Sequence, residues 1–160
     1  MPTIEITTFI QNSQEVAFDL SRSIDLHKIS TQKTNEEAIA GKTKGLIELN
    51  EWVTWRAKHF GVYQKLTSKI TTFDRPHSFT DEMTKGIFSF FKHQHIFKKT
   101  KNGVEMIDIF DYKSPFGIFG KLADSIFLEK YMTNLLKDRN QIIKEFAESD
   151  KWRLIIEEKI

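Results

Sequence analysis

The sequence predicts an α+β domain in which a curved antiparallel sheet wraps around a long C-terminal helix. The prediction rests on strand-like alternation over much of residues 52–112, two short helical segments after one opening strand, and helical spacing over residues 120–148. A chain of 160 residues with 39% apolar residues is long enough to bury one core. No repeat or linker divides it, so residues 1–160 are expected to form a single domain. Helices gathered on one face of the sheet would complete that core.

The opening elements follow from local pattern. One face of an opening strand is predicted by the alternate residues Ile4, Ile6, Thr8 and Ile10. Asn12 precedes Glu15 by three residues, which is the spacing of a capping box, and predicts a helix that begins after Asn12. A second short helix is expected to begin at Ser23. Residues 31–41 are polar and carry little pattern, which predicts a loop or mobile flap.

From residue 43 onward the pattern changes to that of strands. Alternation after Trp52 places Val53, Trp55 and Ala57 on one face. The sequence Asp-Arg-Pro-His at residues 74–77 predicts a turn, because proline sets φ there. Asn-Gly at residues 102–103 is a strong hairpin signal. The expected strands are residues 52–60, 63–73, 78–83, 88–99 and 104–112, within a run of about six.

The sequence SPFGIFG at residues 114–120 ends the strand pattern, and a helix much longer than average is expected over residues 120–148. The apolar loop from Phe116 to Phe119 has two interpretations. If it were exposed, it could dock a protein partner or a membrane surface. The favoured interpretation is that it covers one end of the sheet and closes it.

Composition excludes several classes of function. Net charge is +2 with acids and bases interspersed, so no basic stripe for nucleic acid is expected. The chain has no cysteine, which excludes disulfides, thiol nucleophiles and thiolate metal sites. No signal peptide and no stretch able to span a bilayer are recognised, and a cytoplasmic location is the default expectation. The 14 phenylalanines can build a bulky core or line a cavity with rigid walls.

The hairpin carries the most informative residues, because alternation places polar and aromatic side chains on one inward face. That face collects Phe91, Phe97, Met106, Phe110 and Tyr112 together with His93, His95 and Asp108. With a four-residue turn His95 lies opposite Asp108, and with a two-residue turn the two are diagonal neighbours. By phase with their neighbours, Asp81 can add a second inward carboxylate and His59 a third imidazole.

Three interpretations of this polar face remain open. The histidines can be core residues satisfied by Asp108 and by water, they can form the polar end of a ligand cavity, or they can bind a metal ion. The spacing typical of a strong metal motif is absent, so no metal ion and no other cofactor is expected. His95 oriented by Asp108 is also the candidate general base of an enzyme, although no nucleophile elbow or phosphate loop accompanies it.

The chain resembles the SRPBCC superfamily, the helix-grip fold of START domains and birch-pollen-allergen-like proteins, and in particular a bacterial ligand-binding subgroup. The resemblance covers nearly the whole chain. It departs from the pattern at Asn50, where glycine is expected in a turn. The motifs that carry it are FDLSRSIDLH (18–27), AIAGKTKGLI (38–47), VTWRAKHFG (53–61), ITTFDRP (70–76), the His93/His95 alternation, DIFDYKSP (108–115), and LAD (122–124) leading to Arg139-Asn140.

The resemblance implies a cavity between the sheet and the long helix that binds a small hydrophobic or amphipathic molecule, as lipid-binding relatives do. Polyketide-cyclase-like relatives imply an alternative, an enzyme of the cyclase, dehydratase or hydrolase kind that uses His95 and Asp108. A protein-interaction adaptor is the third alternative. The expected ligand-binding residues are Trp55, His59, Asp81, Phe91, His93, His95, Phe97, Asp108, Phe110 and Tyr112.

Overall fold

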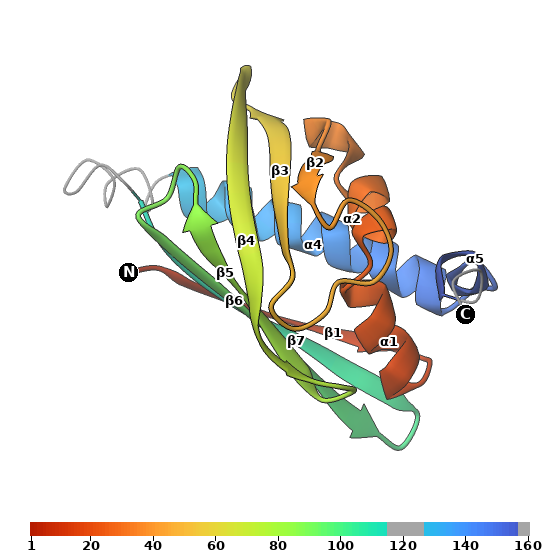
Figure 1. Cartoon of the computed structure of the whole chain (residues 1–160). Helices are drawn as coiled ribbons and strands as arrows, with labels where there is room; N and C mark the ends of the chain where they lie inside the picture. Colours follow the sequence, from red (N-terminus) through yellow and green to blue (C-terminus); the bar gives the residue numbers. More distant parts are fainter. Residues whose placement is uncertain (115–126, 157–160) are drawn as a thin grey trace.

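The computed structural model describes residues 1–114 and 127–156, and its dominant feature is a seven-stranded antiparallel sheet curved around a long helix (Figure 1). The strands lie in the order β1-β7-β6-β5-β4-β3-β2, so the first strand pairs with the last. Their bounds are β1 (Thr3–Ile10), β2 (Glu37–Gly41), β3 (Trp52–His59), β4 (Val62–Asp74), β5 (Ser78–Lys85), β6 (Phe90–Thr100) and β7 (Gly103–Lys113).

Two short helices follow β1, as predicted: α1 (Gln14–Ser21) and α2 (Ile24–Ser30). The predicted cap of α1 is wrong by one residue. Ser13, not Asn12, accepts the N–H of Val16 on its hydroxyl at 3.2 Å. Asn12 instead donates to the carbonyl of Ala147 at 2.6 Å and so ties the start of α1 to the end of the last long helix.

The prediction of a loop over residues 31–41 is wrong in part. A 3₁₀ turn, η1 (Gln32–Thr34), is followed by β2, which pairs with β3 at the edge of the sheet. This strand has five residues and its pairing is interrupted by a bulge, so the local pattern is weak and β3 supplies its hydrogen bonds. At the nearby turn Asn50 has φ 66°, a left-handed conformation that asparagine adopts more readily than most residues.

The predicted hairpin is confirmed as β6 and β7, but its two-residue loop is Lys101-Asn102 and not Asn102-Gly103, since Gly103 already pairs with Thr100. The prediction that a two-residue turn would make His95 and Asp108 diagonal neighbours is therefore wrong. His95 lies directly opposite Asp108 in this register. Alternate residues of both strands are buried on one face, as the alternation predicts. The inward face of the hairpin was therefore predicted correctly, polar residues included.

The long helix α4 (Glu129–Ala147) crosses behind β3 and β4 in Figure 1, and α1 and α2 lie beside its C-terminal half. The predicted start of the helix near residue 120 and the loop from Phe116 to Phe119 lie outside the described residues. A further short helix, α5 (Trp152–Ile156), was not predicted; it packs against α1.

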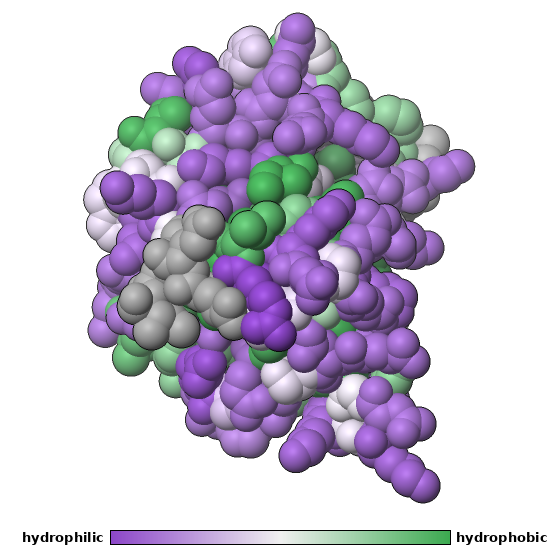
Figure 2. Space-filling model, turned by 90° about the vertical axis from the view of Figure 1, so that its right-hand side faces the viewer, coloured by the Kyte–Doolittle hydropathy of each residue, from purple (hydrophilic) through white to green (hydrophobic). Residues whose placement is uncertain are grey.

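Apolar side chains between the sheet and the helices form two clusters. One surrounds Phe18 of α1, whose ring meets the edges of Phe73, Phe79 and Phe97 at 5.2 to 5.4 Å. The other joins Phe91 and Phe110 of the hairpin to other apolar side chains, among them Leu136 of α4. On the face that carries α1, α2 and α5, apolar surface is confined to small patches among hydrophilic side chains (Figure 2). No helix in the described part is both long and apolar enough to cross a membrane.

Candidate functional site

A cavity of about 640 Å³ lies between the inner face of the sheet and α4. Trp55 of β3, Phe91 of β6 and Phe110 of β7 contribute aromatic walls, and Leu136 of α4 lies across from the sheet. These residues are inward because each strand buries alternate positions. The volume is within the range of pockets that bind small organic molecules.

The polar end of the cavity is formed by Asp81, His93 and His95, which all lie in the cavity wall. Asp81 pairs with His93 across β5 and β6, and His95 follows two residues later on the same face. Nε2 of His95 lies 2.8 Å from Oδ2 of Asp81, and the two imidazole rings lie 3.8 Å apart between centroids. Phe79 stacks on the other side of His95 at 4.2 Å, so the ring of His95 is held between two flat groups.

Asp108 lies behind the two imidazoles and is fully buried. Nε2 of His93 donates to its Oδ1 at 2.8 Å, and Nδ1 of His95 lies 3.2 Å from the same oxygen without the direction of a good hydrogen bond. Asn140 of α4 donates to Oδ2 at 2.6 Å, and the guanidinium of Arg139 lies 3.6 Å from Oδ1. Both oxygens of the carboxylate are therefore occupied, and α4 holds it against the sheet.

These contacts shift the pKa values of the two histidines in opposite directions. Burial lowers the pKa of His93, and the neighbouring His95 lowers it further against the opposing effect of Asp108. For His95 burial also disfavours the charged form, but Asp108 and Asp81 together raise its pKa above the ordinary value. Burial alone would raise the pKa of Asp108, yet the hydrogen bond from His93 and the close approach of His95 hold it well below the usual range. His93 is therefore the neutral imidazole and His95 the one that favours a proton.

The predicted pairing of His95 with Asp108 is correct in register but incomplete in its contacts. The close hydrogen bond of His95 is to Asp81, whereas the close partner of Asp108 is His93. Both nitrogens of His95 thus lie at carboxylates, which removes the free nitrogen that a general base needs. Since ionised Asp108 only accepts, Nε2 of His93 carries the proton, and its Nδ1 is the nitrogen left to accept a proton or bind a ligand.

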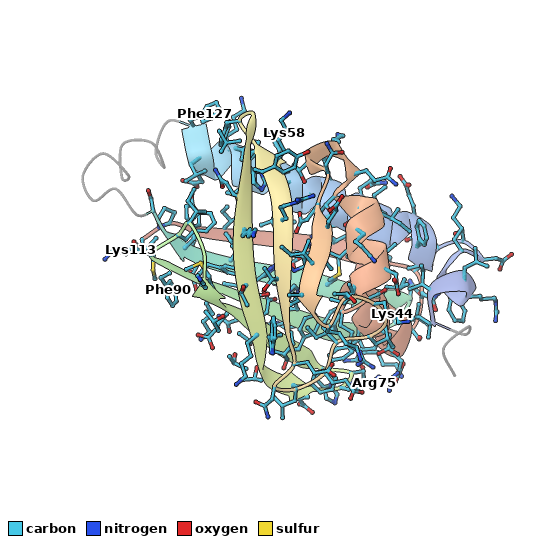
Figure 3. The ribbon with its side chains drawn as sticks, turned by 45° about the horizontal axis from the view of Figure 1, so that its top comes forward. Lys44, Lys58, Arg75, Phe90, Lys113 and Phe127 are labelled. Carbon is cyan, nitrogen blue, oxygen red and sulfur yellow. The ribbon has the colours of Figure 1, made fainter. Side chains whose placement is uncertain are left out.

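The opposite end of the cavity reaches the surface where the β3–β4 turn meets the start of α4. Nδ1 of His59 lies 2.7 Å from the hydroxyl of Tyr131, and the ring of Phe60 contacts the rings of Tyr131 and Phe127 at a tilt. Phe127 and Lys58 are labelled at this end in Figure 3. Phe60 and Phe127 are each 57% exposed and also line the cavity, so solvent reaches the cavity here. His59 lines the cavity as expected, but at the mouth rather than beside His93.

Seven of the predicted ligand-binding residues lie in the cavity wall. The other three do not, within the described residues: Phe97 packs under α1, Asp108 lies behind the histidines, and Tyr112 is fully buried in the hairpin cluster. No role at the site was predicted for Arg139 and Asn140, which contact Asp108, or for Tyr131 at the mouth. All three come from α4, and no local signal relates a helix residue to a strand residue more than 30 positions away.

Comparison with protein-family models gives no match, and comparison with curated proteins gives none either. Solved structures do match. TTHA0849 from Thermus thermophilus superposes with a TM-score of 0.70 at 16% identity, covering 89% of this chain and 97% of that one. Ginseng major latex-like protein 151 from Panax ginseng gives 0.68 at 13% identity, covering 92% and 98%.

The di-domain ARO/CYC protein StfQ of the steffimycin biosynthetic pathway gives a TM-score of 0.73 at 10% identity. The match covers 91% of this chain and 50% of StfQ. At such identities the likeness is one of fold. The chain has the helix-grip fold of these proteins, which is the fold that its resemblance to the SRPBCC superfamily implied.

Proposed function

We propose that the protein binds a small, largely apolar molecule in the cavity between the sheet and α4, with a polar group of that molecule at Asp81 and His93. The observation that carries the proposal is a cavity of about 640 Å³ with aromatic walls, in which Asp81, His93 and His95 converge at one end. A core made only for packing would fill this space, because protein interiors leave few voids larger than a water molecule.

The polar end favours a ligand that donates hydrogen bonds. Neutral His93 offers Nδ1 as an acceptor, and the ionised carboxylate of Asp81 accepts only. The hydrogen bonds of Arg139 go to the side chain of Asn140 and to the carbonyl of Ser21, so this cation is engaged by the protein. A hydroxyl or phenol group therefore fits this end better than a carboxylate does, since a carboxylate would meet acceptors.

The proposal is tested with Nile red, a neutral apolar dye whose fluorescence increases in apolar surroundings. Ala57 lines the cavity, and Ala57→Phe places a ring in that space. Lys58→Phe adds the same ring at the next residue, which faces solvent. We expect Ala57→Phe to weaken dye binding roughly tenfold, which corresponds to about 1.4 kcal/mol, and Lys58→Phe to leave the cavity affinity unchanged.

Equal affinities of the wild type and Ala57→Phe would show that the dye binds elsewhere and would refute the cavity as the binding site. Native mass spectrometry of the protein purified from cells gives a second readout. We expect an added mass that disappears on denaturation and is reduced in Ala57→Phe.

Catalysis by His95 has no such support, because both of its nitrogens lie at carboxylates. The interpretation as an adaptor depended on Phe116 to Phe119, which lie outside the described residues. Ligand binding in the cavity is therefore the function that the geometry supports best.

A further inference from the structure

We propose that Asp81, His93 and His95 form a binding site for a divalent transition-metal ion at the polar end of the cavity. Each residue offers one ligating atom, and these atoms lie within 4.8 Å of one another. His93 and His95 are 6% and 3% exposed, so the group is an interior cluster and not a chance meeting of surface acids. The motif spacing on which the sequence argument relied applies to helices, whereas this group is assembled across two strands.

The distance between two of the ligating atoms already suits an ion. Nε2 of His95 and Oδ2 of Asp81 lie 2.8 Å apart. Two ligands at about 2.0–2.2 Å from a metal ion and near a right angle to one another are separated by roughly 3 Å. An ion can therefore replace the contact between these two atoms. His93, the cross-strand partner of Asp81, supplies the third ligand from the same face of the sheet.

Asp108 provides the support that metal-binding histidines usually have. Such histidines donate the nitrogen that faces away from the metal to a carboxylate or carbonyl, which fixes the ring and its tautomer. Oδ1 of Asp108 accepts a hydrogen bond from Nε2 of His93 at 2.8 Å and lies 3.2 Å from Nδ1 of His95. This leaves Nδ1 of His93 and Nε2 of His95 as the ligating nitrogens. Asn140 in turn holds the other oxygen of Asp108 at 2.6 Å.

Charge and donor type identify the class of ion. An ion bound at Nε2 of His95 displaces the proton of that ring, so that two carboxylates face the guanidinium of Arg139 and a dication replaces the positive charge that is lost. Two imidazoles and one carboxylate favour zinc, iron(II), cobalt(II) or nickel(II) over magnesium or calcium, which prefer oxygen ligands. Because all three residues line the cavity, the remaining coordination positions open onto the space proposed for the ligand.

The probe is cobalt(II), added to protein that has been treated with a chelator and dialysed. Its visible absorption reports ligation by nitrogen and oxygen. We expect one equivalent to bind, with affinity reduced at least about 100-fold by His93→Ala or by Asp81→Asn, and roughly 10- to 100-fold by Asp108→Asn, as for other supporting carboxylates. Asp81→Asn keeps the shape of the side chain, so it remains informative if His93→Ala fails to fold.

His27→Ala is the matched control. His27 also lines the cavity and also pairs with a carboxylate, Glu36 at 2.9 Å, but no second imidazole converges with it among the described residues. We expect cobalt binding by this variant to equal that of the wild type. Binding that is unaffected by Asp81→Asn, or lost equally in His27→Ala, would place the ion elsewhere and overturn the proposal.

The same samples are titrated with Nile red, so that failure of this inference is distinguished from failure of the proposed ligand binding. Dye binding in the cavity without cobalt binding would overturn the metal site alone. Cobalt binding without dye binding in the cavity would support the metal site and count against the proposed function.

Discussion

Replacing Asp108 by asparagine is the sharpest perturbation of the buried network, because this carboxylate joins the sheet to α4. In the metal-free protein Asp108 receives hydrogen bonds from His93 at 2.8 Å and from Asn140 at 2.6 Å, with Nδ1 of His95 at 3.2 Å. Asparagine retains one oxygen but places an NH₂ group where the other was. Either His93 or Asn140 then faces a donor and loses its acceptor.

The magnitude follows from these contacts. One hydrogen bond to a charged group is worth about 1.5–3 kcal/mol. The substitution also removes the negative charge that faces His95 and Arg139, which stay buried. Breaking a buried ion pair from one side typically costs about 3–5 kcal/mol. We expect Asp108→Asn to lower the free energy of unfolding by an amount in that range.

The pH dependence has a definite sign. The raised pKa of His95 means that its pairing contributes fully below the unfolded value of about 6.5 and is lost as pH rises through the folded pKa. The lowered pKa of Asp108 means that its contribution is present above the unfolded value of about 3.9 and is lost as pH falls through the folded pKa. The loss in Asp108→Asn is therefore larger at about pH 6 than at about pH 9.

Chemical denaturation of chelator-treated protein at both pH values measures this difference, and NMR titration of the histidine ring protons should show a lower pKa for His95 in the variant. Asp138→Asn is the control. It removes a carboxylate of α4 that is 49% exposed and lies 3.1 Å from Lys33, and exposed pairs contribute about 0–1 kcal/mol. An equal loss at both pH values, with no histidine titrating differently, would refute the assignment of the network.

Three further predictions concern the frame that holds the site. Asp19 is buried and lies 2.8 Å from Arg22 and 2.6 Å from Arg75, and its pKa is lowered. Asp19→Asn should reduce the free energy of unfolding by roughly 3 kcal/mol, and this loss should shrink as pH falls below about 4. Unfolding curves that differ equally at all pH values would contradict this. Gly103→Ala would place Cβ 2.2 Å from the carbonyl oxygen of Ile10, so thermal unfolding should show a loss of about 1–3 kcal/mol, and an unchanged midpoint would contradict the close approach. Ser13→Ala removes the cap of α1 and should cost about 1 kcal/mol by denaturant unfolding, whereas a cost below about 0.3 kcal/mol would mean that the cap is not formed in solution.

The strands were predictable because buried and exposed side chains alternate with period two along a half-buried strand. Phe91, His93, His95 and Phe97 share the buried face of β6 for this reason, and the same argument applies to Asp108 in β7. The strand β2 was missed, since its five residues carry no such signal and depend on pairing with β3. The cap of α1 was misplaced by one residue because two adjacent residues, Asn12 and Ser13, both have side chains able to cap a helix.

The site was only partly predictable for a related reason. Alternation identified which residues face inward, but it contains no information on which histidine bonds to which carboxylate. The register of β5 and β6 places Asp81 opposite His93, yet the hydrogen bond of Asp81 is to His95, two residues further along β6 on the same face. The ring of His95 also contacts Phe79 of β5 and lies 3.2 Å from Asp108 of β7, and these contacts depend on the tertiary structure.

By itself the sequence determined the order of most elements, the inward face of the hairpin and the presence of histidines and a carboxylate on that face, because these follow from local periodicity. Only the tertiary structure decided that a cavity remains between sheet and helix, that Asp108 is held by Asn140 and approached by Arg139, and that Asp81, His93 and His95 converge. The physical reason is that these features join segments distant in sequence. Their distances are set by how the curved sheet closes on α4, which no local pattern encodes.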